Sequence, residues 1–171
     1  MQFIQYQLSL LFFLFIGFFS PAKCQLGADS LIKANEIFKV SVKQPFAFGA
    51  YSQGSAGGQV NIEPDGTRTV TGTLLPLNMG SVFHPLVIEV EAPRGSIVTM
   101  LSNGIQTLSG SNGGTMLLRM GNILPGNPFY INNDPPQTNL LFVGGVLSVG
   151  DAATTPAGHY SGNFFISFIM E

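Results

Sequence analysis

Two histidines are the first side chains in this sequence to consider for catalysis. His84 stands before Pro85 at the start of an expected strand, and His159 lies in a Gly-His-Tyr turn. A catalytic histidine needs an orienting acid and a nucleophile within reach, and neither residue has such a partner at a motif spacing. The patterns H-x-x-H, H-E-x-x-H and G-x-S-x-G do not occur. We therefore interpret both as surface turn histidines and predict no catalytic residue, so the protein is expected not to be an enzyme.

The carboxylates suggest no metal site either. Glu89 and Glu91 share one face of an expected strand, which could imitate a paired-acid site, but a solvated strand face explains them as well. Asp65, Asp134 and Asp151 stand in turns, where Asp side chains bond to nearby backbone. The spaced acids of a calcium loop are absent. We predict no metal and no cofactor.

Aromatic side chains leave one binding alternative open. The sequence contains no Trp, and Tyr130 lies in a long loop at residues 125–139, beside Phe129 and the pair Asn132-Asn133. Long loops in compact domains are functional or mobile. A tyrosine in such a loop could serve a glycan, because its ring is apolar and its hydroxyl polar. The glycine-rich stretches GSAGG, GSNGG and VGGVLSVG are expected to be turns and bulges, since no helix follows them to hold a phosphate.

Composition limits the class of protein. Apolar residues make up 45% and charged residues 9%, against about 25% charged in an ordinary globular protein. This balance excludes disorder, which needs low hydrophobicity and high charge. With a net charge of −2 and seven scattered Lys and Arg, the chain offers no stripe that could neutralise phosphates, so nucleic acid is not an expected partner.

The N-terminal segment resembles a signal peptide. Residues 8–19 form an apolar run too short to span a membrane, followed by Pro21 and the small-residue frame Ala22-Lys23-Cys24. We predict a signal peptide at residues 1–24 and one domain at residues 25–171, with cleavage after Ala22 as an alternative. Acylation of Cys24 is another, which Lys23 disfavours. The protein is thus expected to be exported, to the periplasm, the cell surface or the medium, without a membrane span or a cysteine in the mature chain.

Short runs of period two between turn residues predict an all-β fold of the sandwich type. In residues 84–95, Leu86, Ile88 and Val90 should face inward and the two glutamates outward. Residues 58–72 read as a hairpin through Pro64-Asp65-Gly66. The remaining expected strands lie in residues 32–43 (with Phe38, Val40 and Val42 on one face), 95–102, 115–121 (with Met116, Leu118 and Met120 on one face), 138–151 (with a bulge or bend at Gly144-Gly145) and 159–170.

The last of these strands raises a question of pairing. Phe164, Ile166 and Phe168 alternate with Phe165 and Ile169, so both faces are apolar and a central position is expected. In one interpretation the strand pairs within its own sandwich. In the other the sheet is completed by a strand from a neighbouring subunit, and the donor would be residues 32–43, preceded by QLGADS.

Two stretches carry a family resemblance. FGAYSQGSAGGQVNIEPDGTRTVTG (residues 48–72) and FVGGVLSVGDAATTPAGHYSGNFFISF (residues 142–168) resemble the bacterial secreted family known as domain of unknown function 4402. Val146 stands where members commonly have Thr. The resemblance implies export by a Gram-negative bacterium and an immunoglobulin-like antiparallel β-sandwich similar in character to pilin and spore-coat subunits, with no established activity and no site residues.

These observations lead to one expectation with one alternative. We expect a non-enzymatic exported β-sandwich that serves as a structural or cell-surface assembly subunit and associates with like subunits, by self-association or strand exchange. The alternative is a secreted module that binds a glycan or matrix through the loop at residues 125–139.

Overall fold

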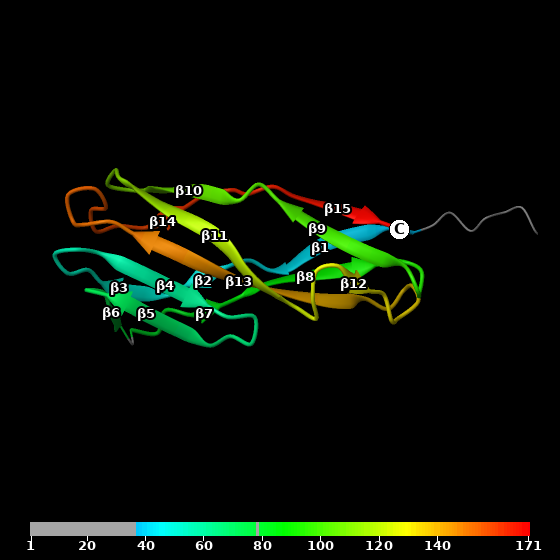
Figure 1. Cartoon of the computed structure of the whole chain (residues 1–171). Coiled ribbons are helices and arrows are strands. Elements are labelled where there is room, and N and C mark those ends of the chain that lie inside the picture. Colours follow the sequence, from blue (N-terminus) through cyan, green and yellow to red (C-terminus); the bar gives the residue numbers. More distant parts are fainter. Residues whose placement is uncertain (1–36, 78) are drawn as a thin grey trace, which may run out of the picture. The chain divides into compact units, whose positions relative to one another are not determined.

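The structure, a computed structural model, describes residues 37–77 and 79–171 (Figure 1). Every regular element in these residues is a strand, and every strand pair is antiparallel, which confirms the predicted all-β antiparallel fold class. The strands are β1 (Lys39–Gln44), β2 (Ala47–Phe48), β3 (Ala50–Ser52), β4 (Gly58–Ile62), β5 (Arg68–Gly72), β6 (Leu75–Leu77), β7 (Phe83–His84), β8 (Leu86–Glu91), β9 (Ile97–Ser102), β10 (Ile105–Gly110), β11 (Thr115–Leu124), β12 (Phe129–Tyr130), β13 (Asn139–Val149), β14 (Tyr160–Ser161) and β15 (Ile166–Met170).

The largest sheet is organised around the long strand β13. Its strands follow the order β1-β8-β13-β11-β10-β14, and the hairpin β4-β5 joins the same sheet through β13. The first half of β13 pairs with β8, as in Leu141 opposite Ile88, and the second half pairs with β4, as in Leu147 opposite Val60. Strand β11 follows the other side of β13. One strand therefore supports both ends of the domain.

The glycine pair in β13 marks this change of partner. A bulge or bend was expected at Gly144-Gly145, but β13 is continuous through both residues, and the irregularity lies on β11 between Met120 and Ile123. A Cβ at Gly145 would come within 2.9 Å of the Phe46 ring. Glycine is needed there because another segment approaches the strand, not because the strand bends.

A second sheet, in the order β12-β9-β15, covers one half of the large sheet. The inward rows of β8 and β13 meet those of β9 and β12 in a cluster that we name the two-sheet core. Leu86, Ile88 and Val90 belong to it, as predicted. Its buried members are Leu86, Ile88, Val90, Ala92, Val98, Met100, Phe129, Ile131, Leu141 and Val143.

The other half of the large sheet carries a second cluster, which we name the groove core. Its buried members are Val60, Leu74, Leu108, Met116, Leu118, Leu147 and Val149. The predicted inward row of Met116 and Leu118 is confirmed. Phe46 and Phe164 pack against both clusters, and their rings meet edge to face with centroids 6.0 Å apart. These two phenylalanines connect the two halves of the domain.

The final segment differs from its prediction. Residues 159–170 are not one strand but two, β14 and β15, with residues 162–165 outside regular structure. Strand β15 pairs with β9 alone, so among the described residues it is the edge of the three-stranded sheet and not a central strand. The apolar residues on its second face are not covered by a sheet. Phe165 is 76% exposed.

The first described strand bears on the alternative of strand exchange. Residues 32–43 were proposed as a donor for a neighbour, but β1 pairs with β8 of its own sheet, with Val40 opposite Val90. Residues 32–36 and the predicted signal peptide at residues 1–24 lie outside the described residues. A donor strand would therefore have to be supplied by residues before β1.

Candidate functional site

The outer edge of β15 carries backbone groups that pair with no other strand in residues 37–77 and 79–171. Glu171 and Ile97 exchange both of their backbone hydrogen bonds, each at 2.9 Å. Bonded and non-bonded pairs alternate in an antiparallel ladder, so Ser167 and Ile169 also bond to β9. The N–H and C=O groups of Ile166, Phe168 and Met170 then point to the open edge. Met100, opposite Phe168, agrees with this alternation, because its own N–H and C=O bond to the Asn127 side chain.

The side chains of β15 are incompletely covered on both faces. Ile166, Phe168 and Met170 face the two-sheet core and pack against it, yet all three remain half-buried. On the opposite face Ile169 is exposed, next to exposed Leu101 on β9, and Phe165, directly before the strand, is exposed as well. An apolar strand open at one edge and on one face is a template for another strand.

Strand β1, an edge of the large sheet, leaves part of its inner face uncovered. Val42 lies directly opposite Ile88, so both side chains share the face toward the two-sheet core. Ile88 is 1% exposed, whereas Val42 is 60% exposed. We name the incompletely covered inner faces of β1 and β15, which both border the two-sheet core, the open flank. Both faces carry apolar side chains.

A groove of about 870 Å³ lies in the other half of the domain. Its floor is the apolar surface of the groove core, formed by Leu108, Met116, Leu118 and Leu147. One wall is residues 45–53, which directly follow β1, and the other is residues 156–164, which directly precede β15. The groove therefore lies between the N-terminal and C-terminal segments of the domain. Its aromatic residues Phe46 and Phe48 stack with ring centroids 5.5 Å apart.

Two tyrosines on opposite walls lie in this groove with their hydroxyls engaged internally. The Tyr51 hydroxyl donates to the Met116 sulfur at 3.0 Å, and the Tyr160 hydroxyl donates to the Pro156 carbonyl at 2.6 Å. Burial, with a smaller contribution from Tyr160, raises the pKa of Tyr51 to about 12. Both tyrosine hydroxyls of the groove are thus already engaged within the protein.

The residues singled out for chemistry are not brought together. His159 is exposed near Ser111, but His84 is not in a surface turn; it pairs with Ala47 in the short strand β7, and its buried Nδ1 has no hydrogen-bond partner. Glu89 and Glu91 lie on the outer face of β8. Within residues 37–77 and 79–171, no three His, Cys, Asp or Glu side chains cluster as metal ligands would.

The three aspartates do lie in turns, as predicted. Asp65 accepts a hydrogen bond from the Thr67 backbone at 2.8 Å, and Asp151 accepts from Thr154 at 2.8 Å. These backbone bonds lower the pKa of both carboxyl groups. Asp134 accepts from the Arg94 backbone at 3.0 Å. Asp65 and Asp151 thus stabilise their own turns, whereas Asp134 joins its turn to the segment that contains Arg94.

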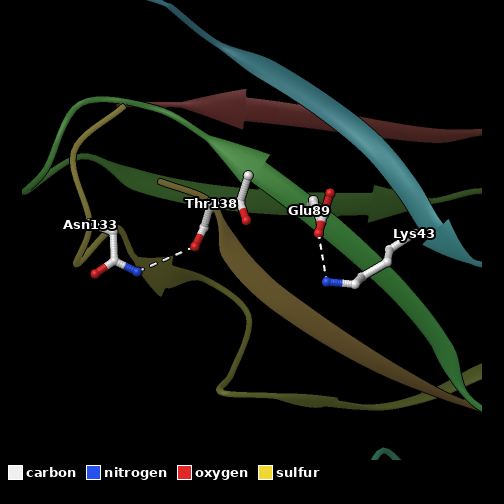
Figure 2. A network of polar contacts seen from close by, with 4 residues as sticks. All are labelled: Lys43, Glu89, Asn133 and Thr138. Carbon is white, nitrogen blue, oxygen red and sulfur yellow. Dashed lines mark hydrogen bonds and ion pairs between the residues drawn. The ribbon is translucent and has the colours of Figure 1, made fainter. Parts of the chain in front are cut away.

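The loop at residues 125–139 is held by its own amides. Asn133 Nδ2 donates to the Thr138 carbonyl at 3.3 Å (Figure 2), and the Asn139 side chain accepts from the backbone of Asn132 and Asn133. Phe129 is buried in the two-sheet core, whereas Tyr130 is 65% exposed. Of the aromatic residues in this loop, Tyr130 is the one available to a ligand.

The groove and the open flank were not predicted. Both arise between segments about a hundred residues apart, and a single sequence gives no sign of which segments face each other. The nearest local signal is the alternation of Phe46 and Phe48 before the Gly-Ala-Tyr stretch, which indicates an inward row. No helix in the described residues is long and apolar enough to cross a membrane.

These observations define a class: an antiparallel all-β domain with two packed sheets, in which β15 lies at a sheet edge among the described residues. Within that class, the chain belongs to the family described as domain of unknown function (DUF4402), whose model matches residues 38–169. The family resemblance drawn from residues 48–72 and 142–168 is thereby confirmed. Neither the curated proteins nor the solved structures gave a significant match.

Proposed function

We propose that the protein is an exported, non-enzymatic structural subunit that assembles with like subunits on the cell surface by adding a strand to the edge of β15. The observation that carries the proposal is the unprotected state of this edge. Natural edge strands are usually shortened, bulged or charged to prevent pairing with other chains. Strand β15 has five residues, none charged and none Pro, in a regular register with β9.

The incomplete burial around β15 supports the same function. An added strand would satisfy the free groups of Ile166, Phe168 and Met170 and cover their half-buried side chains. The predicted absence of cysteine from the mature chain agrees with a subunit that gains stability from its neighbours rather than from disulfides.

Light scattering during size exclusion, on the full chain exported through its own leader, tests this function. We expect oligomers whose mass rises with protein concentration. Ser167→Lys places a charge on β15 and should shift the protein toward monomer. Ser41→Lys is the matched control, because Ser41 is also exposed in the middle of an edge strand, opposite Glu89. A wild-type chain that stays monomeric at all concentrations would contradict the proposal.

A second candidate function rests on Tyr130. Its exposed ring beside Asn132 suits a glycan or matrix ligand better than any other described aromatic side chain in the loop at residues 125–139. A glycan array that gives signal, and loses it on Tyr130→Ala, would favour this function. Unchanged signal after that substitution would count against it.

A further inference from the structure

We propose that the strand added to β15 is residues 25–36 of a second copy of this chain, lying antiparallel to residues 160–170 and filling the open flank and the groove. This inference rests on the proposed assembly function and on the predicted cleavage before Gln25. It goes further in naming the partner segment, its direction and the geometry of the assembly.

The length of the segment matches the length of the opening. Residues 25–36 are twelve in number and precede the described domain directly; residues 160–170, which include the end of the groove wall and β15, are eleven. At about 3.3 Å per residue, an extended segment of this length reaches roughly 40 Å. It could therefore cover both the edge of β15 and the wall of the groove next to β14.

The residue pattern of the segment suits one apolar and one polar face. Leu26, Ala28, Ile32 and Ala34 fall at period two, with Ser30 between them, and the opposite face is mostly polar, with Asp29 and Lys33 but also Leu31. The apolar face is made mostly of small side chains, which would lie above rows of large ones such as Phe168 and Phe164. Small residues facing large ones can interdigitate without overpacking.

Register and connectivity fix where the donor domain would lie. Lys39 at the start of β1 is opposite Glu91, and Met170 at the end of β15 is opposite Val98, so both lie at the end of the domain formed by the loop at residues 92–96. Figure 1 shows the C-terminus and the start of β1 at the same end of the fold. We name this the near end, and the opposite end the far end.

An antiparallel donor enters at the near end of the acceptor and leaves at its far end. The donor domain, which continues at Ile37, would then lie beyond the far end of the acceptor, with its own near end facing it. Each copy would donate at one end and accept along its flank. Such a head-to-tail contact does not close on itself, so it gives a filament. A parallel donor would instead bring two near ends together and allow a closed dimer.

Disulfide trapping tests the partner segment. Ser167 bonds to β9, so a strand added on the other side would face it in a non-hydrogen-bonded pair, where Cα atoms are close enough for a disulfide. Ser167→Cys is mixed under mild oxidation with Gly27→Cys, Asp29→Cys or Leu31→Cys, all in a Cys24→Ala background. These three donor positions lie on the face opposite Leu26 and Ile32. The matched control partner is Thr71→Cys, exposed on the edge strand β5.

We expect at least one mixture to form a disulfide dimer at about ten times the yield of its Thr71→Cys control, because pairing raises the local thiol concentration toward the mM range. Mass analysis should show one donor and one acceptor chain in each dimer. A Ser167→Cys sample that cross-links with itself, while the mixtures do not, would instead indicate pairing between two β15 strands and overturn the inference.

Light scattering on the same samples separates the two proposals. Oligomers without any donor cross-link would overturn the inference but leave the assembly function standing. A monomer at every concentration would overturn both. A discrete dimer with donor cross-links would support the partner segment and contradict the head-to-tail filament.

Discussion

The open flank and the groove are bordered by two chain segments with opposite properties, which we call walls. Residues 39–53 form the N-terminal wall, in which β1, β2 and β3 each pair with a strand of the same chain. The edge of β1 carries Lys39 and Lys43, a register shift after Val42, and an ion pair from Lys43 to Glu89 at 2.8 Å (Figure 2). Residues 160–170 form the C-terminal wall, with no charged side chain and, along β15, one edge that pairs with no other described strand.

This difference shows that protection against pairing is distributed unevenly within one chain. The lysines and the irregular register of β1 are the devices by which proteins discourage edge pairing. Lysines and an irregular register occur on β1 but not on β15. Overall composition does not explain this difference, since both strands belong to the same chain. The contrast favours the C-terminal wall as the partner-binding edge.

The largest expected effect compares two side chains that face the same core from paired strands. Ile88→Ala should lower the free energy of unfolding by about 2–5 kcal/mol, because it removes a buried side chain and leaves a cavity. Val42→Ala should cost below about 1 kcal/mol, since its side chain is mostly in water. Urea denaturation of the monomer measures both. Equal losses of unfolding free energy would mean that the Val42 side chain is buried in solution.

An intermediate effect is expected within the C-terminal wall. Phe168→Ala should lower the free energy of unfolding by about 1–2 kcal/mol, a part of the value for a fully buried side chain, because its ring is half-buried. Phe165→Ala is the control, because this phenylalanine lies directly before β15 and is mostly exposed; it should change the free energy of unfolding by no more than about 0.5 kcal/mol. Thermal and urea unfolding at a concentration that keeps the protein monomeric would measure the pair. If Phe165→Ala lowered the free energy of unfolding more than Phe168→Ala, the burial assigned to these two rings would be wrong.

Each wall carries a tyrosine, and Tyr51 predicts that the stability of the fold depends on pH. The pKa of Tyr51 is about 12 in the folded protein, above its ordinary value of 10, so folding favours the protonated phenol. The resulting stability is fully present below pH 10 and is lost as pH rises toward 12. Tyr51→Phe should abolish this alkaline loss. Unfolding measured between pH 9 and pH 12 tests it, and a wild-type curve that stays flat across that range would contradict it.

The smallest effect belongs to the charged N-terminal wall. Lys43→Ser breaks the ion pair with Glu89, but both side chains are partly exposed, so the free energy of unfolding should fall by no more than about 0.5 kcal/mol. The change should be smaller still at high salt. A loss of unfolding free energy comparable to that of Phe168→Ala would show that the main role of Lys43 is to stabilise the fold and not to prevent strand pairing at the edge of β1.

The sequence predicted the local features of the fold well because they depend on local patterns. Alternation placed Leu86, Ile88 and Val90 in the core, and Pro64-Asp65-Gly66 was identified as the turn between β4 and β5, since turn residues and side-chain parity are properties of neighbouring residues.

Features that depend on distant segments were missed. Phe165 and Ile169 suggested that β15 has neighbours on both sides, but their exposure reflects an uncovered face and not a central position. Gly145 suggested a bulge, but its reason is the ring of Phe46, a hundred residues earlier. The groove likewise exists only once β13 has brought the two ends of the chain together.

The lack of charge on the C-terminal wall has a consequence for the rate at which a partner would be captured. Without opposite charges to steer the encounter, the association rate constant should stay in the range of about 10⁵–10⁶ M⁻¹s⁻¹ and change little with ionic strength. The binding free energy would then come from burying apolar rows and pairing backbone groups, and its apolar part weakens on cooling. Assemblies built on this edge should therefore form slowly, tolerate salt, and loosen in the cold.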